Sequence, residues 1–104
     1  NLDQTIGAEI KKTRPAVIVS NDAIGKLPLK IIVPLTGWEE QFAQADWHVR
    51  LKMGKENGLT KDSSADTFQV RSVSETRLVR KVGKLTEEEM MQIESGLRIS
   101  LGLE

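Results

Sequence analysis

A chain of 104 residues has room for one domain, and its 38% of hydrophobic and 29% of charged residues are typical of a globular protein. The 15 lysines and arginines are balanced by 15 acidic residues, so no overall field attracts nucleic acid, and a polyanion has to meet a local basic patch. The absence of cysteine excludes a disulfide framework, a thiolate zinc site and a cysteine nucleophile. No apolar run has transmembrane length and no signal peptide opens the chain, so the cytoplasm is the expected location.

The first part of the chain predicts two strands. Residues 1–13 are polar and are expected to form a loop. The β-branched run over residues 16–20 is typical of a buried strand. After a connection in which Leu27 is expected to pack inward, residues 29–35 predict a second strand, and Pro34 suits the end of that strand better than its centre.

Three further strands are predicted in the middle of the chain. Residues 38–45 indicate a short helix or an ordered loop, and the alternating apolar and polar residues over 47–52 predict a half-buried strand. The polar stretch 54–66 indicates a long loop around one short element. Alternation over 68–73 and an apolar run over 78–82 predict the fourth and fifth strands.

The C-terminal segment predicts a helix. Thr86 is its expected N-cap, and Glu89 completes a capping box three residues later. Gly102 is expected to end the helix. The apolar stripe at helical spacing consists of Met90, Ile93, Leu97 and Leu101. With strands first and a helix last, the order predicts a mainly β fold with α (α+β), a small SH3-like antiparallel β-barrel or bent sheet with a C-terminal helix packed on it.

One stretch before the first predicted strand concentrates charge. It holds Glu9, Lys11, Lys12 and Arg14, and Arg14 stands at the entrance of a rigid strand. A guanidinium held there suits a phosphate clamp, because its planar fork offers two parallel donors. Thr36, at the end of the next predicted strand, is a hydroxyl that can lie beside it. The alternative is that Arg14 caps a sheet edge and Thr36 satisfies a turn, and these residues alone favour that alternative.

Metal chemistry has little support in the sequence. His48 is the single histidine, and it lies on the polar face of a predicted strand, where a structural or surface role is expected rather than a ligand role. Asp62 and Asp66 flank a serine pair, but their spacing matches no calcium-binding loop, so a solvated loop is expected there. No metal or cofactor is predicted.

Several segments together resemble the MazF/PemK family of toxins. Residues 7–22 are similar to the opening of these chains, with Gly-x-Glu, a few polar residues, Arg-Pro, an apolar strand and then a polar residue. Residues 33–36 resemble the family's strand ending in Pro-x-Thr, and residues 69–73 resemble its Gln-x-Arg-Thr-Ile segment. Residues 90–103 are similar to its closing helix. The resemblance implies a single toxin domain over residues 1–104, without the further first strand with which members usually begin.

The resemblance implies an activity and roles for particular residues. Members cleave single-stranded RNA, often messenger RNA, at short sequence motifs without metal, by attack of the ribose 2′-oxygen on the adjacent phosphate. Arg14 matches the arginine expected to stabilise the transition-state charge, Thr36 matches the threonine whose hydroxyl holds a phosphate oxygen, and Glu9 matches a base or positioning group. Lys11, Lys12 and Gln69 are expected RNA contacts, although solvated surface lysines are the alternative for the first two.

A second basic group is expected to be solvated charge at a sheet edge: Arg71, Arg77, Arg80, Lys81 and Lys84. The resemblance further implies a homodimer with RNA in a groove across it, in the bacterial cytoplasm. It also implies a cognate antitoxin whose acidic, partly disordered tail enters that groove, with operator DNA reached only through the antitoxin.

Three alternatives remain open at the level of sequence. The chain can be a non-catalytic or truncated toxin-fold protein that binds its antitoxin, or a gyrase poison similar to CcdB, whose architecture is alike. It can also be an SH3-like peptide-binding module, although such modules use an aromatic groove and this chain has no tyrosine. The combination of Glu9, Arg14 and Thr36 favours the ribonuclease.

Overall fold

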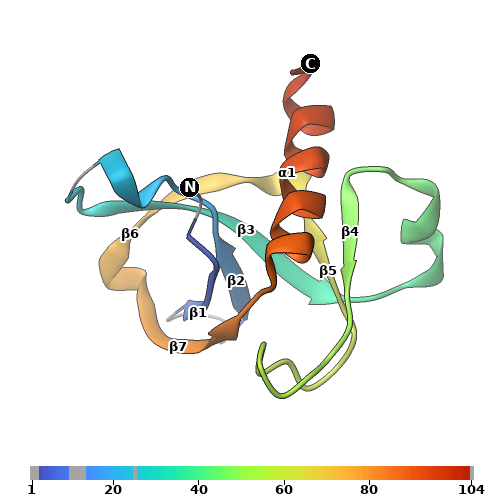
Figure 1. The fold of residues 1–104 in the computed structure, drawn as a ribbon, viewed down its shortest axis with the longest axis horizontal. Coiled ribbons are helices and arrows are strands. Elements are labelled where there is room, and N and C mark those ends of the chain that lie inside the picture. Colours follow the sequence, from blue (N-terminus) through green and yellow to red (C-terminus); the bar gives the residue numbers. More distant parts are fainter. Residues whose placement is uncertain (1–2, 10–13, 25, 104) are drawn as a thin grey trace.

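The protein is an open, strongly bent antiparallel sheet with one helix (Figure 1). The computed structural model describes residues 3–9, 14–24 and 26–103. Within these residues the strands are β1 (Thr5–Glu9), β2 (Pro15–Ile18), β3 (Leu29–Gly37), β4 (His48–Leu51), β5 (Ser63–Asp66), β6 (Arg71–Ser74) and β7 (Leu78–Lys84). The helical segments are α1 (Glu87–Leu101) and the short 3-10 turns η1 (Asp22–Ile24), η2 (Glu40–Gln44), η3 (Thr67–Gln69) and η4 (Glu75–Arg77).

The described strands follow the order β4-β5-β3-β2-β1-β7, and β6 pairs with β3 off this path. The predicted fold class is therefore confirmed in its bent-sheet form, because the strand path ends at β4 and β7 without closing into a barrel. No helix in the described residues has the length and apolarity needed to cross a membrane.

Strand β3 is paired along both of its edges. On one edge Ile32–Pro34 pair with β2, while on the other edge Leu29–Ile32 pair with β6 and Leu35–Gly37 pair with β5. Pro34 was expected at a strand end, but it lies inside β3, at the step where the pairing passes from β6 to β5. A residue without an N–H is tolerated at such a gap in the ladder, which explains this exception.

The continuous apolar run of β2 is buried on both of its faces. One face faces the main core, which β3, β4, β5 and α1 also line, and its fully buried members are Ile6, Val17, Val33, Leu51, Ala65 and Ile93. The opposite face contributes to a smaller cluster of Ala16, Ile18, Ile32 and Val73, with Leu78 packed against it. Burial on both faces removes the alternation of a half-exposed strand, which is why this segment is apolar throughout.

The expectation of a loop over residues 1–13 is wrong for residues 5–9, which form β1. This strand lies between β2 and β7 and pairs with both. Ile6, Gly7 and Ala8 are three consecutive buried residues, so neither face of β1 is solvated. A short strand with small residues buried on both sides has no periodic pattern, so its polar composition misled the prediction.

Of two further expectations in the second half of the chain, one is confirmed and one needs correction. The polar stretch 54–66 is a loop with one short element, as expected, and that element is the strand β5, in which Ser63 and Ser64 are buried. The strand expected over 68–73 begins only at Arg71, because residues before it form the turn η3. Phe68 within that turn is 68% exposed.

The C-terminal helix confirms its predicted caps. Oγ1 of Thr86 accepts a hydrogen bond from the backbone N–H of Glu89 at 3.1 Å, and Oε1 of Glu89 accepts one from the N–H of Thr86 at 2.9 Å. Gly102 ends the helix in the left-handed conformation, with φ 68°. The apolar stripe is buried only at its start, since Leu101 is 57% exposed, and Leu27, expected to pack inward, is 53% exposed. In Figure 1 the last turns of α1 project beyond the sheet.

We expect Gly83→Ala to lower the free energy of unfolding by about 2–3 kcal/mol, because of overpacking against backbone that cannot move aside. A β-carbon added at Gly83 would lie 2.3 Å from the carbonyl carbon and oxygen of Asn57. Gly54→Ala is the matched control, since a β-carbon there meets nothing within 4 Å. Urea unfolding of both variants measures the difference in the free energy of unfolding. Equal stabilities would contradict the close packing of β7 against the loop that contains Asn57.

Candidate active site

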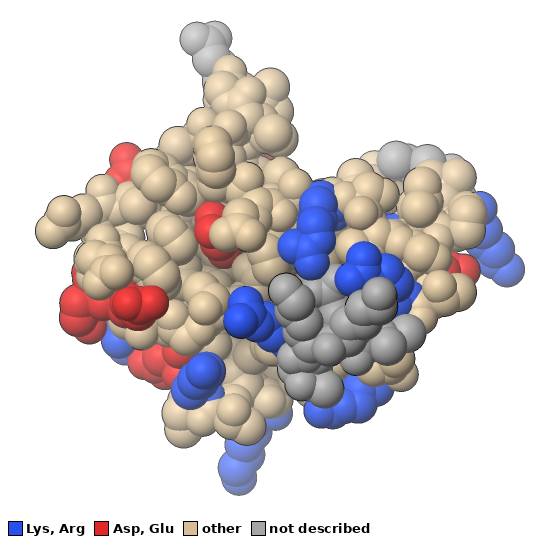
Figure 2. Space-filling view, turned by 180° about the vertical axis from the view of Figure 1, so that it is seen from behind, with Lys and Arg blue, Asp and Glu red and all other residues tan. Residues whose placement is uncertain are grey.

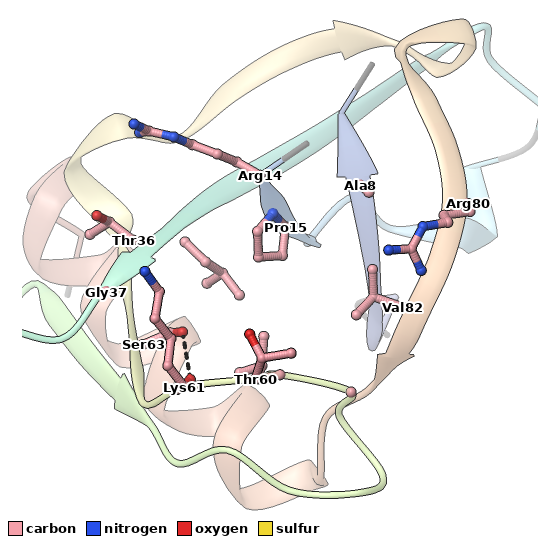
Figure 3. A pocket seen from close by; sticks show the side chains of 13 residues that line it. Ala8, Arg14, Pro15, Thr36, Gly37, Thr60, Lys61, Ser63, Arg80 and Val82 are labelled. Atoms are coloured by element: carbon pink, nitrogen blue, oxygen red, sulfur yellow. Dashed lines mark hydrogen bonds between the residues drawn. The ribbon is translucent and has the colours of Figure 1, made fainter. Parts of the chain in front are cut away.

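Arg14 and Thr36 meet because of the register between β2 and β3. Ala16 pairs with Pro34 in this antiparallel ladder, and the same register extended by two residues brings Arg14 opposite Thr36. Both residues line one pocket of about 350 Å³ at the end of β3. In Figure 3 the side chain of Arg14 extends toward the side of the pocket on which Thr36 lies. The expectation that these two residues lie at one site agrees with this placement.

Two further cations line the same pocket. Lys61 comes from the loop between β4 and β5, and Arg80 comes from β7. In Figure 3 the guanidinium of Arg80 points inward from one wall, while the ammonium of Lys61 points toward Gly37 on the opposite wall. Arg80 is exposed on β7, which ends the strand path, as expected of solvated charge at a sheet edge, but the sequence did not predict that it also lines the pocket. Arg80 pairs with Ala8 of β1, which lines the pocket too, and β1 was not predicted.

The pocket is positively charged in a chain whose formal net charge is zero. Among the side chains described in its lining, Arg14, Lys61 and Arg80 are cationic and none is acidic. On the face shown in Figure 2, lysines and arginines gather in the middle and at the lower right, whereas most acidic side chains lie toward the left. Charge is therefore segregated rather than spread evenly, which satisfies the need for a local basic patch.

The remaining predicted site residues are placed less completely. Glu9 ends β1, where its backbone pairs with Leu78 beside the pocket-lining Ala8, and its side chain is outside the described structure. Lys11 and Lys12 lie outside the described residues. Gln69 is exposed in η3 and does not line the pocket, and its Nε2 donates a hydrogen bond to Asp66 at 2.8 Å.

The loop that carries Lys61 is held by a buried asparagine. Oδ1 of Asn57 accepts hydrogen bonds from the N–H groups of Gly54 at 3.1 Å and Leu59 at 2.9 Å, while its Nδ2 donates to the carbonyl of Lys52 at 2.8 Å. Gly58 has φ 69° and approaches the carbonyl of Val82 so closely that a β-carbon there would lie 2.2 Å from it. This loop is therefore a fixed wall of the pocket.

Asp62 ties the same loop to its surroundings. Its carboxylate accepts hydrogen bonds from the N–H of Met53 at 3.0 Å and from the guanidinium of Arg50 at 3.3 Å. These contacts, the one from Met53 first, hold the pKa of Asp62 below its usual value despite some opposing desolvation. Because folding lowers the pKa of Asp62, its ionised carboxylate stabilises the folded state at pH values above the unfolded pKa. This stabilisation is lost as the pH falls through the folded pKa. The Asp62 side chain remains partly exposed, so the loop is solvated as predicted, and it is also anchored.

His48 has structural partners, as the sequence indicated. Its ring stacks on Phe42 with 3.9 Å between centroids, and Nδ1 lies 2.7 Å from the hydroxyl of Ser64. The indole of Trp38 lies at the edge of Phe42 and under the guanidinium of Arg50, 4.9 Å from the ring centre. Within the described part of the chain, no group of three or more histidine, aspartate or glutamate side chains is gathered in the manner of a metal site.

We expect Asn57→Ala to lower the free energy of unfolding by about 2 kcal/mol, because two buried N–H donors lose their acceptor. The amide of Leu59 should then exchange with solvent much faster, while amides in α1 change less. Denaturant unfolding and hydrogen exchange measure the two effects. Unchanged protection at Leu59 would mean that this side chain does not organise the loop.

Two solved structures share this fold. Mycobacterium tuberculosis toxin MazF-mt6 superposes with a TM-score of 0.81 at 18% sequence identity, over 97% of this chain and 98% of the other. An endoribonuclease in complex with its cognate antitoxin, from a mycobacterial species, superposes with a TM-score of 0.78 at 21% identity, over 100% of this chain and 97% of the other. At these identities the likeness establishes the bent sheet and terminal helix as a shared fold.

Sequence comparison goes further than the fold. Endoribonuclease MazF9 of Mycobacterium tuberculosis is 30% identical over 109 aligned positions, which cover 99% of this chain and 90% of that protein. The family model for the PemK-like, MazF-like toxin of type II toxin–antitoxin systems matches residues 1–101. Since that match spans almost the whole chain and both walls of the pocket, this protein belongs to the family of PemK-like and MazF-like toxins.

Proposed function

We propose that this toxin is an endoribonuclease that cleaves single-stranded RNA, messenger RNA in particular, at a short sequence motif and without a metal ion. The observation that carries the proposal is the cationic pocket in which Arg14 and Thr36 lie together. The relative from Mycobacterium tuberculosis that is 30% identical is named an endoribonuclease, which supports the same activity here.

The proposed reaction is an internal phosphoryl transfer. The ribose 2′-oxygen forms a bond to the adjacent phosphorus, the bond to the 5′-oxygen breaks, and the products are a 2′,3′-cyclic phosphate and a 5′-hydroxyl end. The 2′-hydroxyl proton passes to a base, and the leaving 5′-oxygen gains a proton. Negative charge grows on the non-bridging oxygens, where the guanidinium of Arg14 stabilises it and the hydroxyl of Thr36 donates a hydrogen bond.

Residues around the pocket complete the proposed site. Glu9 follows the pocket-lining Ala8 and is assigned the base or a positioning role. Lys11 and Lys12 are assigned phosphate contacts along the RNA. Asp66 uses one N–H of Nε2 of Gln69, so its Oε1 and its second N–H are offered to a base edge.

An antitoxin is the proposed protein partner. A similar mycobacterial endoribonuclease has been solved with its cognate antitoxin, and so have MazE–MazF complexes from Deinococcus radiodurans. An acidic, partly disordered tail meets the same cations as RNA does, and it therefore excludes RNA by occupying their pocket. Operator DNA is bound through the antitoxin in this proposal.

The exposed apolar side chains of α1 support a homodimer. Met91 and Leu101 of α1 are 67% and 57% exposed, and Leu103 just after the helix is 58% exposed. These residues and Leu97 line one groove that also holds charged side chains. Exposed apolar side chains that gather in this way are typical of an interaction surface. A twofold partner is the proposed occupant, because self-association is the commonest way in which such chains cover an apolar face.

Arg14→Ala and Thr36→Val test the proposed reaction on a mixed-sequence single-stranded RNA in excess EDTA. We expect the unmodified protein to leave 5′-hydroxyl ends at a short motif, and each variant to lower kcat/KM by at least about 100-fold, as the loss of one transition-state contact does. Valine keeps the shape of Thr36 and suits a strand, so its effect reports the hydroxyl.

Lys55→Ala is the matched control for these variants, since Lys55 is exposed and lies outside both the pocket and the α1 groove. Cleavage by Arg14→Ala at the unmodified rate would refute the site. No cleavage by any of the proteins would refute the ribonuclease and favour a toxin-fold protein that only binds its antitoxin.

We expect the purified protein to sediment at twice the mass of one chain, and Leu101→Lys to shift it toward the monomer. Lysine suits the last turn of a helix, so α1 should remain folded while its apolar groove gains a charge. Sedimentation velocity over a range of concentrations measures the shift. A dimer that Leu101→Lys leaves unchanged would place the interface elsewhere.

A further inference from the structure

The ammonium of Lys61 occupies a defined position beside Thr36. A β-carbon added at Gly37 would lie 3.2 Å from Nζ of Lys61, 3.4 Å from its Cε and 3.8 Å from its Cδ. The end of the lysine side chain therefore lies against Gly37, the residue that follows Thr36, and a β-carbon there would displace the ammonium by a few tenths of an ångström. Figure 3 shows the ammonium directed to this part of the pocket wall.

The backbone that follows Lys61 is anchored to β3. Gly37 pairs with Ser63, and Oγ of Ser63 donates a hydrogen bond to the carbonyl of Lys61 at 3.0 Å. The N–H of Trp38 donates to the carbonyl of Asp62 at 3.0 Å. Lysine side chains are usually flexible in solvent, but these contacts fix the backbone from which the Lys61 side chain extends.

The charge of Lys61 is not used by a neighbouring carboxylate in the described residues. The nearest acid in sequence, Asp62, is occupied by Met53 and Arg50. No ion pair of Lys61 is formed with any described side chain, and the described pocket lining holds no acid. An ammonium in a pocket that is also lined by a hydroxyl and two guanidinium groups favours an anion with several oxygens.

We propose that Lys61 is a third substrate-binding group of this site, and that its ammonium neutralises a non-bridging oxygen of the scissile phosphate next to Thr36. The inference rests on the proposed RNA cleavage and adds a residue to it. Arg14 reaches the pocket from β2 and Lys61 reaches it from the loop before β5, so two cations line the pocket on either side of the end of β3. Charge that develops on the phosphate is then met from both walls without rearrangement. Gly37 is the positioning residue that keeps the space open.

Lys61→Met tests the charge, since methionine retains much of the apolar stem. We expect kcat/KM for the mixed-sequence RNA to fall by about 10- to 100-fold, and Lys61→Arg to recover most of it. Lys55→Ala is the control, because it removes the same charge from the same loop outside the pocket. The temperature of unfolding should be unchanged in all three. Cleavage by Lys61→Met within about twofold of the unmodified rate would overturn the inference.

Gly37→Ala tests the geometry without removing any charge. Alanine is compatible with the strand backbone, and its β-carbon displaces the flexible end of Lys61, so kcat/KM should fall by about 3- to 10-fold through misplacement. Introduced together with Lys61→Met, the same change should have no further effect, because nothing remains to be displaced. Equal losses in both backgrounds would mean that Gly37 acts in another way, and the inference would fail.

Failure of the proposed function is distinguishable from failure of this inference. Should the unmodified protein cleave no RNA, the ribonuclease proposal fails first. Inorganic phosphate is then the probe, with the amide resonances of Thr36 and Gly37 followed by NMR. Shifts that Lys61→Met weakens and Lys55→Ala does not would uphold Lys61 as an anion-binding group. Shifts that are absent, or that Lys61→Met leaves unchanged, would overturn it.

Discussion

Pairing along both edges of β3 is the constraint on which the rest of the molecule depends. Ladders with β2 on one edge, and with β6 and β5 on the other, place most of the sheet directly, and β1, β4 and β7 follow through one or two more pairings. Because the second edge changes partner at Pro34, the two halves of the sheet bend apart around this strand. The part of the sheet with β4 and β5 therefore runs in a different direction from the part with β2, β1 and β7. A pocket lies at the end of β3, lined by residues from both parts.

The pocket gathers residues that are distant in sequence because two registers converge there. Extension of the β2–β3 ladder brings Arg14 to Thr36, and the β3–β5 ladder pairs Thr36 with Ser64. A shift of either ladder by one residue would turn one of these side chains to the opposite face of the sheet. The chemistry of the site therefore depends on pairing in the sheet more than on contacts between the site residues themselves.

Sequence reasoning succeeded where the determinants are local. The capping box of Thr86 and Glu89, the end of the helix at Gly102 and the apolar strands β2 and β3 follow from spacing and residue type within a few positions. It failed for β1, and it gave β5 only as a short element of unnamed type, because the burial of both depends on strands that arrive from elsewhere in the chain. Arg14 and Thr36 were identified as partners only when the family resemblance was added.

The rest of the site was beyond local inference for the same reason. Arg80 enters the pocket because β7 pairs with β1, and β1 itself was not predicted. Lys61 enters it because the loop behind it packs on β7 and its backbone is tied to β3. A lysine in a polar loop has no pattern that separates it from a solvated one, so only the folded arrangement distinguishes the two.

The close packing of the loop on β7 has a consequence for the lengths of related chains. Gly58 approaches Val82, and Gly83 approaches Asn57, with no side chain between the two backbones. An inserted residue here would break both approaches at once and move one wall of the pocket. The turn over Glu40–Gln44 contains no buried residue. Insertions and deletions among family members should therefore accumulate near that turn and be rare in the loop before β5. The lengths of aligned segments would then distinguish the parts of the fold that hold the pocket in place from the surface that can vary.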